Sequence, residues 1–190
     1  MPPLYILLEG NDDERFFNRV LLPYFEAHGH SVHIWKYACE KRKTTIQFLK
    51  SLKSQGLGFI FVRDIDSAPS VRAKKEELIR TYEGLTEERI AVVVMEIESW
   101  YLAGADRELL KRYCINPAFF TSTDALTKEG FNRLIPRRIP RVVFMQEILR
   151  QFHIGQARER NRSFQYFTER WMEWREGHNP CTTISRREKG

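Results

Sequence analysis

Residues 4–13 read LYILLEGNDD, and this stretch decides the fold. Its first five residues form a short, continuous apolar run, as expected of a strand that is buried in a sheet. Glu9 and Gly10 follow directly, and Asn11 with Glu14 three residues later resembles a capping pair at the start of a helix. The stretch therefore predicts a strand that leads into a helix, with a carboxylate at the junction.

The same alternation of apolar and amphipathic segments continues through the first half of the chain. It predicts further strands at residues 31–37, 59–62 and 90–95, and helices at residues 12–28, 44–53 and 70–82. Such an order predicts an α/β fold with a mostly parallel, Rossmann-like sheet flanked by helices. Right-handed crossovers place the carboxyl ends of all strands at one edge, where ligands bind in sheets of this kind.

Beyond residue 102 the pattern becomes helical. Helices are predicted at residues 106–113, 123–132, 140–152 and 163–176. We therefore expect an α/β domain over residues 1–104 and a helical, basic C-terminal extension packed on it over residues 105–190.

The charge is distributed unevenly between these parts. The net charge is +6, but residues 131–190 hold 13 Lys and Arg against 6 Asp and Glu, which is +7. The remaining residues are close to neutral. An apolar fraction of 42% excludes a disordered chain, and the basic region favours a polyanionic partner such as nucleic acid.

Three of the four predicted strands end in carboxylates. These are Glu9, Asp12 and Asp13 after the first strand, Asp64 and Asp66 after the third, and Glu96 and Glu98 after the fourth. Like charges that meet at one edge repel each other unless a cation neutralises them. Carboxylate oxygens suit Mg²⁺ or Mn²⁺, and such clusters carry out metal-assisted phosphoryl transfer or phosphodiester hydrolysis.

The spacing suggests a role for each residue. Asp64 and Asp66 lie two apart, so in a continuing strand both point to one face and can share a metal. Glu9 is placed as a third ligand or as the general acid/base, with Asp13 in the first helical turn above it. Gly10 allows a sharp turn and the close approach of a phosphate.

Each carboxylate also has a simpler interpretation. Asp13 and its acidic neighbours can complement a helix N-terminus, and Asp64 and Asp66 can be turn residues. Glu96 and Glu98 can be cap or surface groups, and the sequence does not decide which of the two reaches a metal. The coincidence of three acidic strand ends favours the metal site.

The order Glu9-Gly10-x-x-Asp13 followed by Asp64-x-Asp66 resembles the signature of the toprim family. Toprim domains occur in topoisomerases, bacterial primases, recombination proteins and the overcoming-lysogenization-defect (OLD) nucleases. The resemblance implies that Glu9 is the general acid/base and a metal ligand, and that Asp64 and Asp66 bind Mg²⁺.

Two further stretches resemble small stand-alone OLD-like toprim proteins: EIESWYLA at residues 96–103 and SFQYF at residues 163–167. This resemblance implies a nuclease that works with an ATPase partner in phage defence or DNA repair. OLD-family nucleases often carry a further lysine near the site, for which Arg63, Lys74 and Lys75 are the candidates here.

The basic region holds six arginines that we expect to contact nucleic-acid phosphates. They are Arg137, Arg138, Arg141, Arg158, Arg160 and Arg162. The alternative is a solvated helix face. The nearby aromatic residues Phe164, Phe167, Trp171 and Trp174 recur at helical spacing, which favours a place in the core over stacking on bases.

Several other classes are excluded by missing motifs. The chain has neither a GxxxxGKS phosphate loop nor a GxSxG nucleophile elbow, and its three cysteines form no zinc pattern. It has no apolar run long enough for a membrane span, and its first residues lack the features of a signal peptide, so we expect a cytoplasmic protein.

The sequence thus predicts a Mg²⁺- or Mn²⁺-dependent nuclease that hydrolyses phosphodiester bonds of nucleic acid; DNA is favoured as the partner, but the sequence does not decide between DNA and RNA. The alternative is a non-catalytic toprim-like module that binds nucleic acid or a protein. A nucleotidyl transferase or primase ranks lower, because the short chain shows no separate nucleotide-binding fingerprint.

Overall fold

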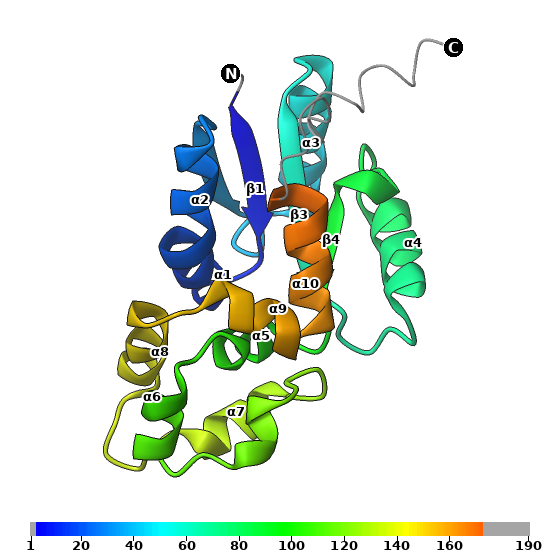
Figure 1. Cartoon of the computed structure of the whole chain (residues 1–190). Coiled ribbons are helices and arrows are strands. Elements are labelled where there is room, and N and C mark those ends of the chain that lie inside the picture. The colour runs from blue at the N-terminus through cyan, green and yellow to red at the C-terminus, as the bar shows by residue number, and fades with distance from the viewer. Residues whose placement is uncertain (1–2, 173–190) are drawn as a thin grey trace. The chain divides into compact units, whose positions relative to one another are not determined.

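The computed structural model describes residues 3–172. The chain divides into two compact units (Figure 1). In the described chain the first unit holds residues 3–92 and 169–172, and the second unit holds residues 93–168. We call them the sheet unit and the helical unit. The helical unit is therefore inserted into the sheet unit, whereas the sequence predicts a single boundary after residue 104.

Within residues 3–172 the strands form one all-parallel, four-stranded sheet, which confirms the predicted α/β fold. The strands are β1 (Leu4–Leu8), β2 (Val32–Lys36), β3 (Gly58–Asp64) and β4 (Ile90–Val93), in the order β2-β1-β3-β4. β1 lies between β2 and β3, with Leu7 opposite Trp35 on one side and Phe61 on the other. This central place explains why the first apolar run is almost wholly buried.

The helices of the sheet unit follow the predicted alternation. They are α1 (Asn11–Phe16), a π-helical turn η1 (Phe17–Leu21), α2 (Leu22–Ala27), α3 (Arg42–Ser54), α4 (Val71–Thr81) and the short η2 (Glu87–Arg89). The predicted helix 12–28 is thus continuous but contains a π-helical turn in its middle, a feature that periodicity does not reveal.

Strand order decides which face each helix covers. The crossovers from β1 to β2 and from β2 to β3 run in opposite directions, so right-handedness puts α1–α2 on one face of the sheet and α3 on the other. The core on the second face joins Leu7, Phe59 and Phe61 of the strands to Leu49 of α3 and Leu78 of α4. Alternate residues of β1 and β3 therefore point toward α3 and α4.

The helical unit is built around α5 (Ile97–Ala103), every residue of which is buried. Its other elements are α6 (Arg107–Arg112), η3 (Pro117–Phe120), α7 (Lys128–Leu134), α8 (Arg141–Arg150), α9 (Ile154–Arg160) and α10 (Arg162–Phe167). α5 packs against α7, α8 and α9. Residues 97–103 therefore belong to the helical core, which is why the unit begins before residue 104.

Two of the four aromatic residues that were predicted to lie in the core, Phe164 and Phe167, are buried. Trp100 of α5 packs on Phe164 and Phe167, with ring centroids 5.2 and 5.3 Å away. Trp171 lies in η4 (Thr168–Met172) and is partly exposed, and Trp174 lies outside the described residues. Phe164 and Phe167 are buried, so neither ring is accessible for stacking on a base.

Candidate functional site

The carboxyl ends of β1 and β3 mark the place where a ligand is expected to bind. β2 and β3 flank β1 on opposite sides, so the direction of the crossovers reverses between β1 and β3. Open parallel sheets bind their ligands in the crevice at such a switch point, outside the carboxyl ends of the strands. Glu9 directly follows β1, and Asp64 is the last residue of β3.

Arg63 joins the two strand ends. Its Nη1 lies 2.9 Å from Glu9 Oε1, and its Nη2 lies 3.2 Å from Asp66 Oδ2. The strand register explains the first contact, because Leu7 lies opposite Phe61 and two more steps along both strands lead to Glu9 and Arg63. One guanidinium fork thus holds a carboxylate from each strand end.

Asp66 has a second cationic partner in Lys74 of α4. The Lys74 ammonium donates to Asp66 Oδ2 over 2.7 Å, and the Lys74 side chain is only 4% exposed. Lys74 is held in place because α4 begins at the cap Ser70, whose hydroxyl accepts from the Ala73 amide. Lys74, which the sequence offers only as one of three candidates for a lysine near the site, therefore belongs to it.

Asp64 and Asp66 do not share one strand face, contrary to the prediction. β3 ends at Asp64, and Asp66 has a left-handed backbone with φ of 49°. Asp tolerates this conformation because its short side chain can form hydrogen bonds with nearby groups. The left-handed backbone also ends the strand pattern in which alternate side chains point to the same face of the sheet. Asp66 therefore turns to Arg63 and Lys74, while Asp64 closes the strand.

The surroundings shift the pKa of two groups at this edge. Burial alone would raise the pKa of Asp66, but the Lys74 hydrogen bond and the Arg63 charge outweigh burial, so the pKa lies below its ordinary value. Burial raises the pKa of the Tyr37 hydroxyl well above its ordinary value, and the nearby Arg63 charge offsets only part of this rise. Asp66 is therefore ionised and Tyr37 is neutral at physiological pH.

Asp13 serves the start of α1. Its Oδ2 accepts a hydrogen bond from the Gly10 amide over 3.0 Å, and the residue is 8% exposed. This contact supports the simpler interpretation of Asp13 as a helix-terminus residue. Gly10 has an extended backbone, with φ of −133°, so it does not form the sharp turn that was expected. A Cβ at Gly10 would lie 3.3 Å from Asp13 Oδ2, so the contact with Asp13 is what favours glycine.

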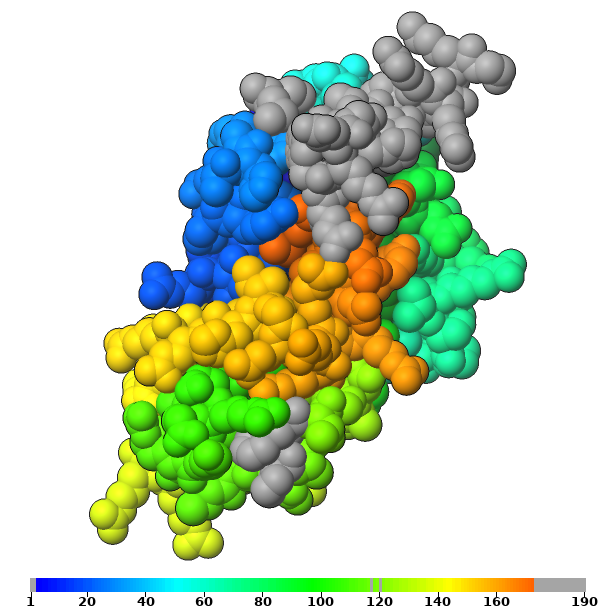
Figure 2. All heavy atoms as spheres, in the orientation of Figure 1, coloured from blue at the N-terminus to red at the C-terminus, as the bar shows by residue number. Residues whose placement is uncertain are grey.

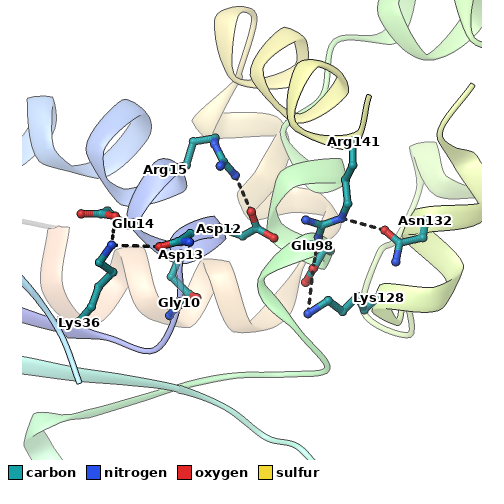
Figure 3. Close-up of polar contacts among 11 residues, drawn as sticks. Gly10, Asp12, Asp13, Glu14, Arg15, Lys36, Glu98, Lys128, Asn132 and Arg141 are labelled. Atoms are coloured by element: carbon teal, nitrogen blue, oxygen red, sulfur yellow. Dashed lines mark hydrogen bonds and ion pairs between the residues drawn. The ribbon is translucent and has the colours of Figure 1, made fainter. Parts of the chain in front are cut away.

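The other acidic residues of α1 are paired with nearby cations (Figure 3). Asp12 accepts from Arg15 one turn later, and Glu14 pairs with Lys36 at the end of β2 over 2.7 Å. Lys36 also donates to the Asn11 side chain over 3.0 Å. These contacts attach the start of α1 to β2.

Glu96 and Glu98 belong to the helical unit and have partners there, and Figure 3 shows those of Glu98. A Glu96 oxygen accepts from the Lys128 amide at the start of α7. Glu98 is 2% exposed and binds Arg141 of α8, which also donates to Asn132 over 2.9 Å. Burial raises the pKa of Glu98, although Lys128 and Arg141 favour its ionised form. Through these contacts the two carboxylates attach α7 and α8 to α5.

The six arginines expected to bind phosphate have different environments. Arg137 and Arg138 are exposed, and Figure 2 shows their yellow-green stretch on the surface. The Arg162 side chain is 92% exposed and lies 3.6 Å from Asp124. Arg141 and Arg158 are partly exposed, and Arg141 binds Glu98. Arg137, Arg138 and Arg162 are therefore the arginines most open to a phosphate.

Arg160 contradicts the prediction. It is 4% exposed, and its Nη1 donates to the carbonyls of Ala103 and Ala105 over 3.2 and 3.1 Å. Burial lowers the pKa of Arg160. The guanidinium thus donates to carbonyls at and just after the end of α5, and because it is buried it is not accessible to a phosphate in solution.

The site can be tested for its fit to a divalent cation. Glu9 and Asp66 are oxygen donors of the kind that Mg²⁺ prefers, and both converge on one positive charge, the Arg63 guanidinium. This stand-in shows that the two carboxylates share a cation. As the side chains are placed, no group of three His, Cys, Asp or Glu residues within the described chain could hold a metal. The oxygen donors therefore match Mg²⁺ in kind, but as placed they are paired with Arg63 and do not form a metal site of three ligands.

Comparison with known proteins finds no matching family model, no matching curated protein and no matching solved structure. The toprim resemblance therefore rests on the motif residues alone. Among the described residues, no helix is long and apolar enough to cross a membrane.

Sequence reasoning missed the role of Arg63 as a bridge. The signal was present, because Arg63 lies two residues after Phe61 and Glu9 lies two residues after Leu7. Pairing these two strands in register would have placed Glu9 beside Arg63. The contact between Lys74 and Asp66 carries no comparable signal, because it depends on how α4 packs on the sheet.

Proposed function

We propose that this chain is a Mg²⁺- or Mn²⁺-dependent nuclease of the toprim kind, with its site at the carboxyl ends of β1 and β3. One observation carries the proposal: Glu9 and Asp66 lie at the switch point of a parallel sheet, where both contact the Arg63 guanidinium. Metal-dependent phosphodiester hydrolysis uses carboxylates in this way.

The proposed roles follow from position and exposure. Glu9, Asp64 and Asp66 would hold the cation, which when bound neutralises phosphate charge and activates a water molecule. The Glu9 side chain is 33% exposed, so it can also exchange a proton with water or substrate. Lys74 keeps Asp66 ionised, as the lowered pKa of that carboxyl indicates.

The substrate in this proposal is nucleic acid, DNA rather than RNA. The exposed Arg137, Arg138 and Arg162 are the residues that would contact phosphates. The proposal also includes a cytoplasmic setting and an ATPase partner in phage defence or DNA repair. These last points rest on the resemblance to OLD-like proteins.

The decisive experiment incubates the protein with labelled DNA and RNA in Mg²⁺, Mn²⁺ or EDTA. The variants Glu9→Gln, Asp64→Asn and Asp66→Asn are expected to lose cleavage by about 100-fold or more. Glu83→Gln is the matched control, because this carboxylate is 74% exposed and pairs with Lys50, an exposed lysine. Cleavage that survives EDTA and all three site variants would overturn the proposal.

A second function is favoured by the ion pairs themselves. Arg63 and Lys74 already neutralise Glu9 and Asp66, so the charges of this cluster balance without a metal. This supports a toprim-like module that binds nucleic acid without cleaving it. Binding of labelled DNA in EDTA, with no cleavage under any condition, would favour this function over the nuclease.

The binding surface can be tested in the same assay. The double variant Arg137→Ala/Arg138→Ala is expected to weaken DNA binding and to lower the salt dependence by about one unit of log–log slope for each lost phosphate contact. Arg72→Ala is the control, since this side chain is 88% exposed on α4 of the other unit. Equal DNA affinity of the double variant and Arg72→Ala would show that Arg137 and Arg138 do not contact the DNA.

A further inference from the structure

Helix α3 gathers the positive charge of the sheet unit. Residues 3–92 hold 14 Lys and Arg against 13 Asp and Glu, so this part of the chain is almost neutral. Residues 41–54, which are α3 and the residue before it, hold five Lys and Arg and no Asp or Glu. The rest of residues 3–92 holds nine Lys and Arg against 13 Asp and Glu, which is −4. The near-neutral total therefore conceals one strongly basic helix.

The two sides of α3 differ in composition. Thr45, Leu49 and Leu52 recur at the spacing of one helix face and are buried. The opposite side is exposed and polar. We call it the basic face of α3, and it comprises Arg42, Lys43, Gln47, Lys50, Lys53 and Ser54. Its cations therefore belong to the surface and do not pack the helix on the sheet.

Helix stability does not account for these cations. Lys41, Arg42 and Lys43 lie at the start of α3, where the helix dipole disfavours positive charge, and no acidic residue lies in the first turn. Lys50 pairs with Glu83 over 2.8 Å, but both side chains are more than half exposed, so water and salt weaken this ion pair. The basic face therefore carries charge that an external anion can neutralise.

We propose that the basic face of α3 binds the phosphate backbone of nucleic acid. This inference rests on the proposed function in taking nucleic acid as the partner, but it requires neither a metal nor cleavage. Lys and Arg, together with Gln, Ser and Thr, are side chains that contact phosphates in nucleic-acid complexes. Gln47 lies between the cations of the face, and Ser54 lies at its end. The composition of the face therefore matches this partner.

A membrane or a protein partner would fit a different face. Helices that lie on membranes present Trp, Phe or Leu to the lipid, and the centres of protein interfaces are depleted of charge. The exposed residues of α3 are all polar. Phe48 is partly buried and packs against Trp35, with ring centroids 4.4 Å apart. The exposed side of α3 therefore suits a charged, hydrated chain of phosphates.

The place of α3 in the sheet unit also suits the proposal. β2 ends at Lys36 and α3 begins at Arg42, so the start of the helix lies at the carboxyl edge of the sheet, where Glu9 follows β1. Lys43 and Lys50 are seven residues apart, or about 10 Å along the helix axis. This distance spans about three nucleotides of one strand, at about 3.4 Å each. A strand that contacts both lysines therefore leads toward the edge that holds the proposed site.

The test measures binding of a short labelled DNA duplex to the full chain in EDTA over a range of salt concentrations. Lys43→Gln/Lys50→Gln is expected to weaken binding about tenfold at low salt and to lower the log–log salt slope by about two. Arg72→Gln/Arg80→Gln is the matched control, because it removes two charges from exposed side chains of α4 in the same unit. The control should leave the slope unchanged, and an equal fall in both double variants would overturn the proposal.

A charge-preserving variant separates loss of charge from loss of structure. Lys43→Arg/Lys50→Arg keeps both charges and should bind DNA as the unchanged protein does. Both lysines are exposed, so the melting temperatures of these variants should match that of the unchanged protein. If the double glutamine variant melts early, the single variants Lys43→Gln and Lys50→Gln take its place, each with an expected slope change of about one.

The outcomes separate this inference from the proposed function. An unchanged slope in Lys43→Gln/Lys50→Gln, in a protein that binds DNA, overturns the role of the basic face and leaves the nuclease proposal intact. Binding through the basic face without cleavage in Mg²⁺ or Mn²⁺ overturns the nuclease and leaves this inference standing. Absence of binding to both DNA and RNA in the unchanged protein overturns both. Binding to phosphatidylserine vesicles but to neither nucleic acid assigns the face to a membrane and also overturns the inference.

Discussion

Two groups of carboxylates lie in the two units of this chain, and their surroundings differ. At the sheet edge, Glu9 and Asp66 are 33% and 45% exposed and share the cation Arg63. In the helical unit, Glu98 is 2% exposed and binds Arg141 between helices. The first group is partly exposed to solvent, whereas the carboxylate of the second is buried. Acidic residues at predicted strand ends therefore differ in function according to what covers them.

The largest expected effect tests the enclosed group. Glu98→Ala removes the carboxylate that pairs with Arg141 and leaves this largely buried cation without that counter-charge, so we expect the free energy of unfolding to fall by about 3 kcal/mol. Urea denaturation followed by circular dichroism measures this change.

The control is Glu108→Ala, since Glu108 is 74% exposed and pairs with Lys111 one turn away on α6. Its loss should change the free energy of unfolding by less than about 0.5 kcal/mol. If Glu98→Ala and Glu108→Ala lowered the free energy of unfolding equally, the burial of Glu98 would not contribute to stability as this comparison requires.

The next effect compares two arginines that are neighbours in the sequence. Arg160→Ala leaves the buried carbonyls of Ala103 and Ala105 without their donor, so we expect a loss of about 2 kcal/mol in unfolding free energy. Arg162→Ala, at a side chain that is 92% exposed, should leave stability nearly unchanged. Urea unfolding distinguishes the two, and a larger loss in Arg162→Ala would reverse the assignment of Arg160 to the interior.

The smallest effect is the dependence of stability on pH. The folded-state pKa of Asp66 lies below its ordinary value of 3.8, so ionised Asp66 adds stability above that pH and loses it as the pH falls through the folded-state value. The folded-state pKa of Glu98 lies above its ordinary value of 4.5, so its contribution declines as the pH rises through the range above 4.5.

Unfolding measured across this range in the unchanged protein, Asp66→Asn and Glu98→Gln checks both signs. The difference between the unchanged protein and Asp66→Asn should grow with pH to about 0.5 kcal/mol, a small value because Asp66 is 45% exposed. The difference between the unchanged protein and Glu98→Gln should shrink with rising pH. Two slopes of the same sign would contradict the contrast between the open and the enclosed carboxylates.

The sheet and its acidic edge were predictable because they depend on local patterns. The apolar run from Leu4 to Leu8 and the alternation that follows it fix strand and helix order, and right-handed crossovers then bring Glu9 and Asp64 to one edge. The left-handed backbone of Asp66 was not predictable, since it depends on bonds from Lys74 and Arg63 that form only in the folded chain.

The helical unit was harder to predict from the sequence for the same reason. Glu98 follows β4 in the chain and so looks like a strand-end carboxylate, but residues 97–103 form α5 and are buried by α7, α8 and α9. Arg160 lies in a charged segment that looks like a surface helix, yet its guanidinium is buried and donates to the Ala103 carbonyl. Both results depend on tertiary packing, which charge and spacing do not encode.

The insertion of the helical unit has a consequence for how the chain folds during synthesis. Residues 169–172 belong with the sheet unit, and Tyr24 of α2 donates a hydrogen bond to the Met172 carbonyl. The ribosome makes residues 93–168 before this last segment. The sheet can therefore form early, but its unit is completed only after the whole inserted unit has emerged, so the final docking step closes a long loop and comes late in folding.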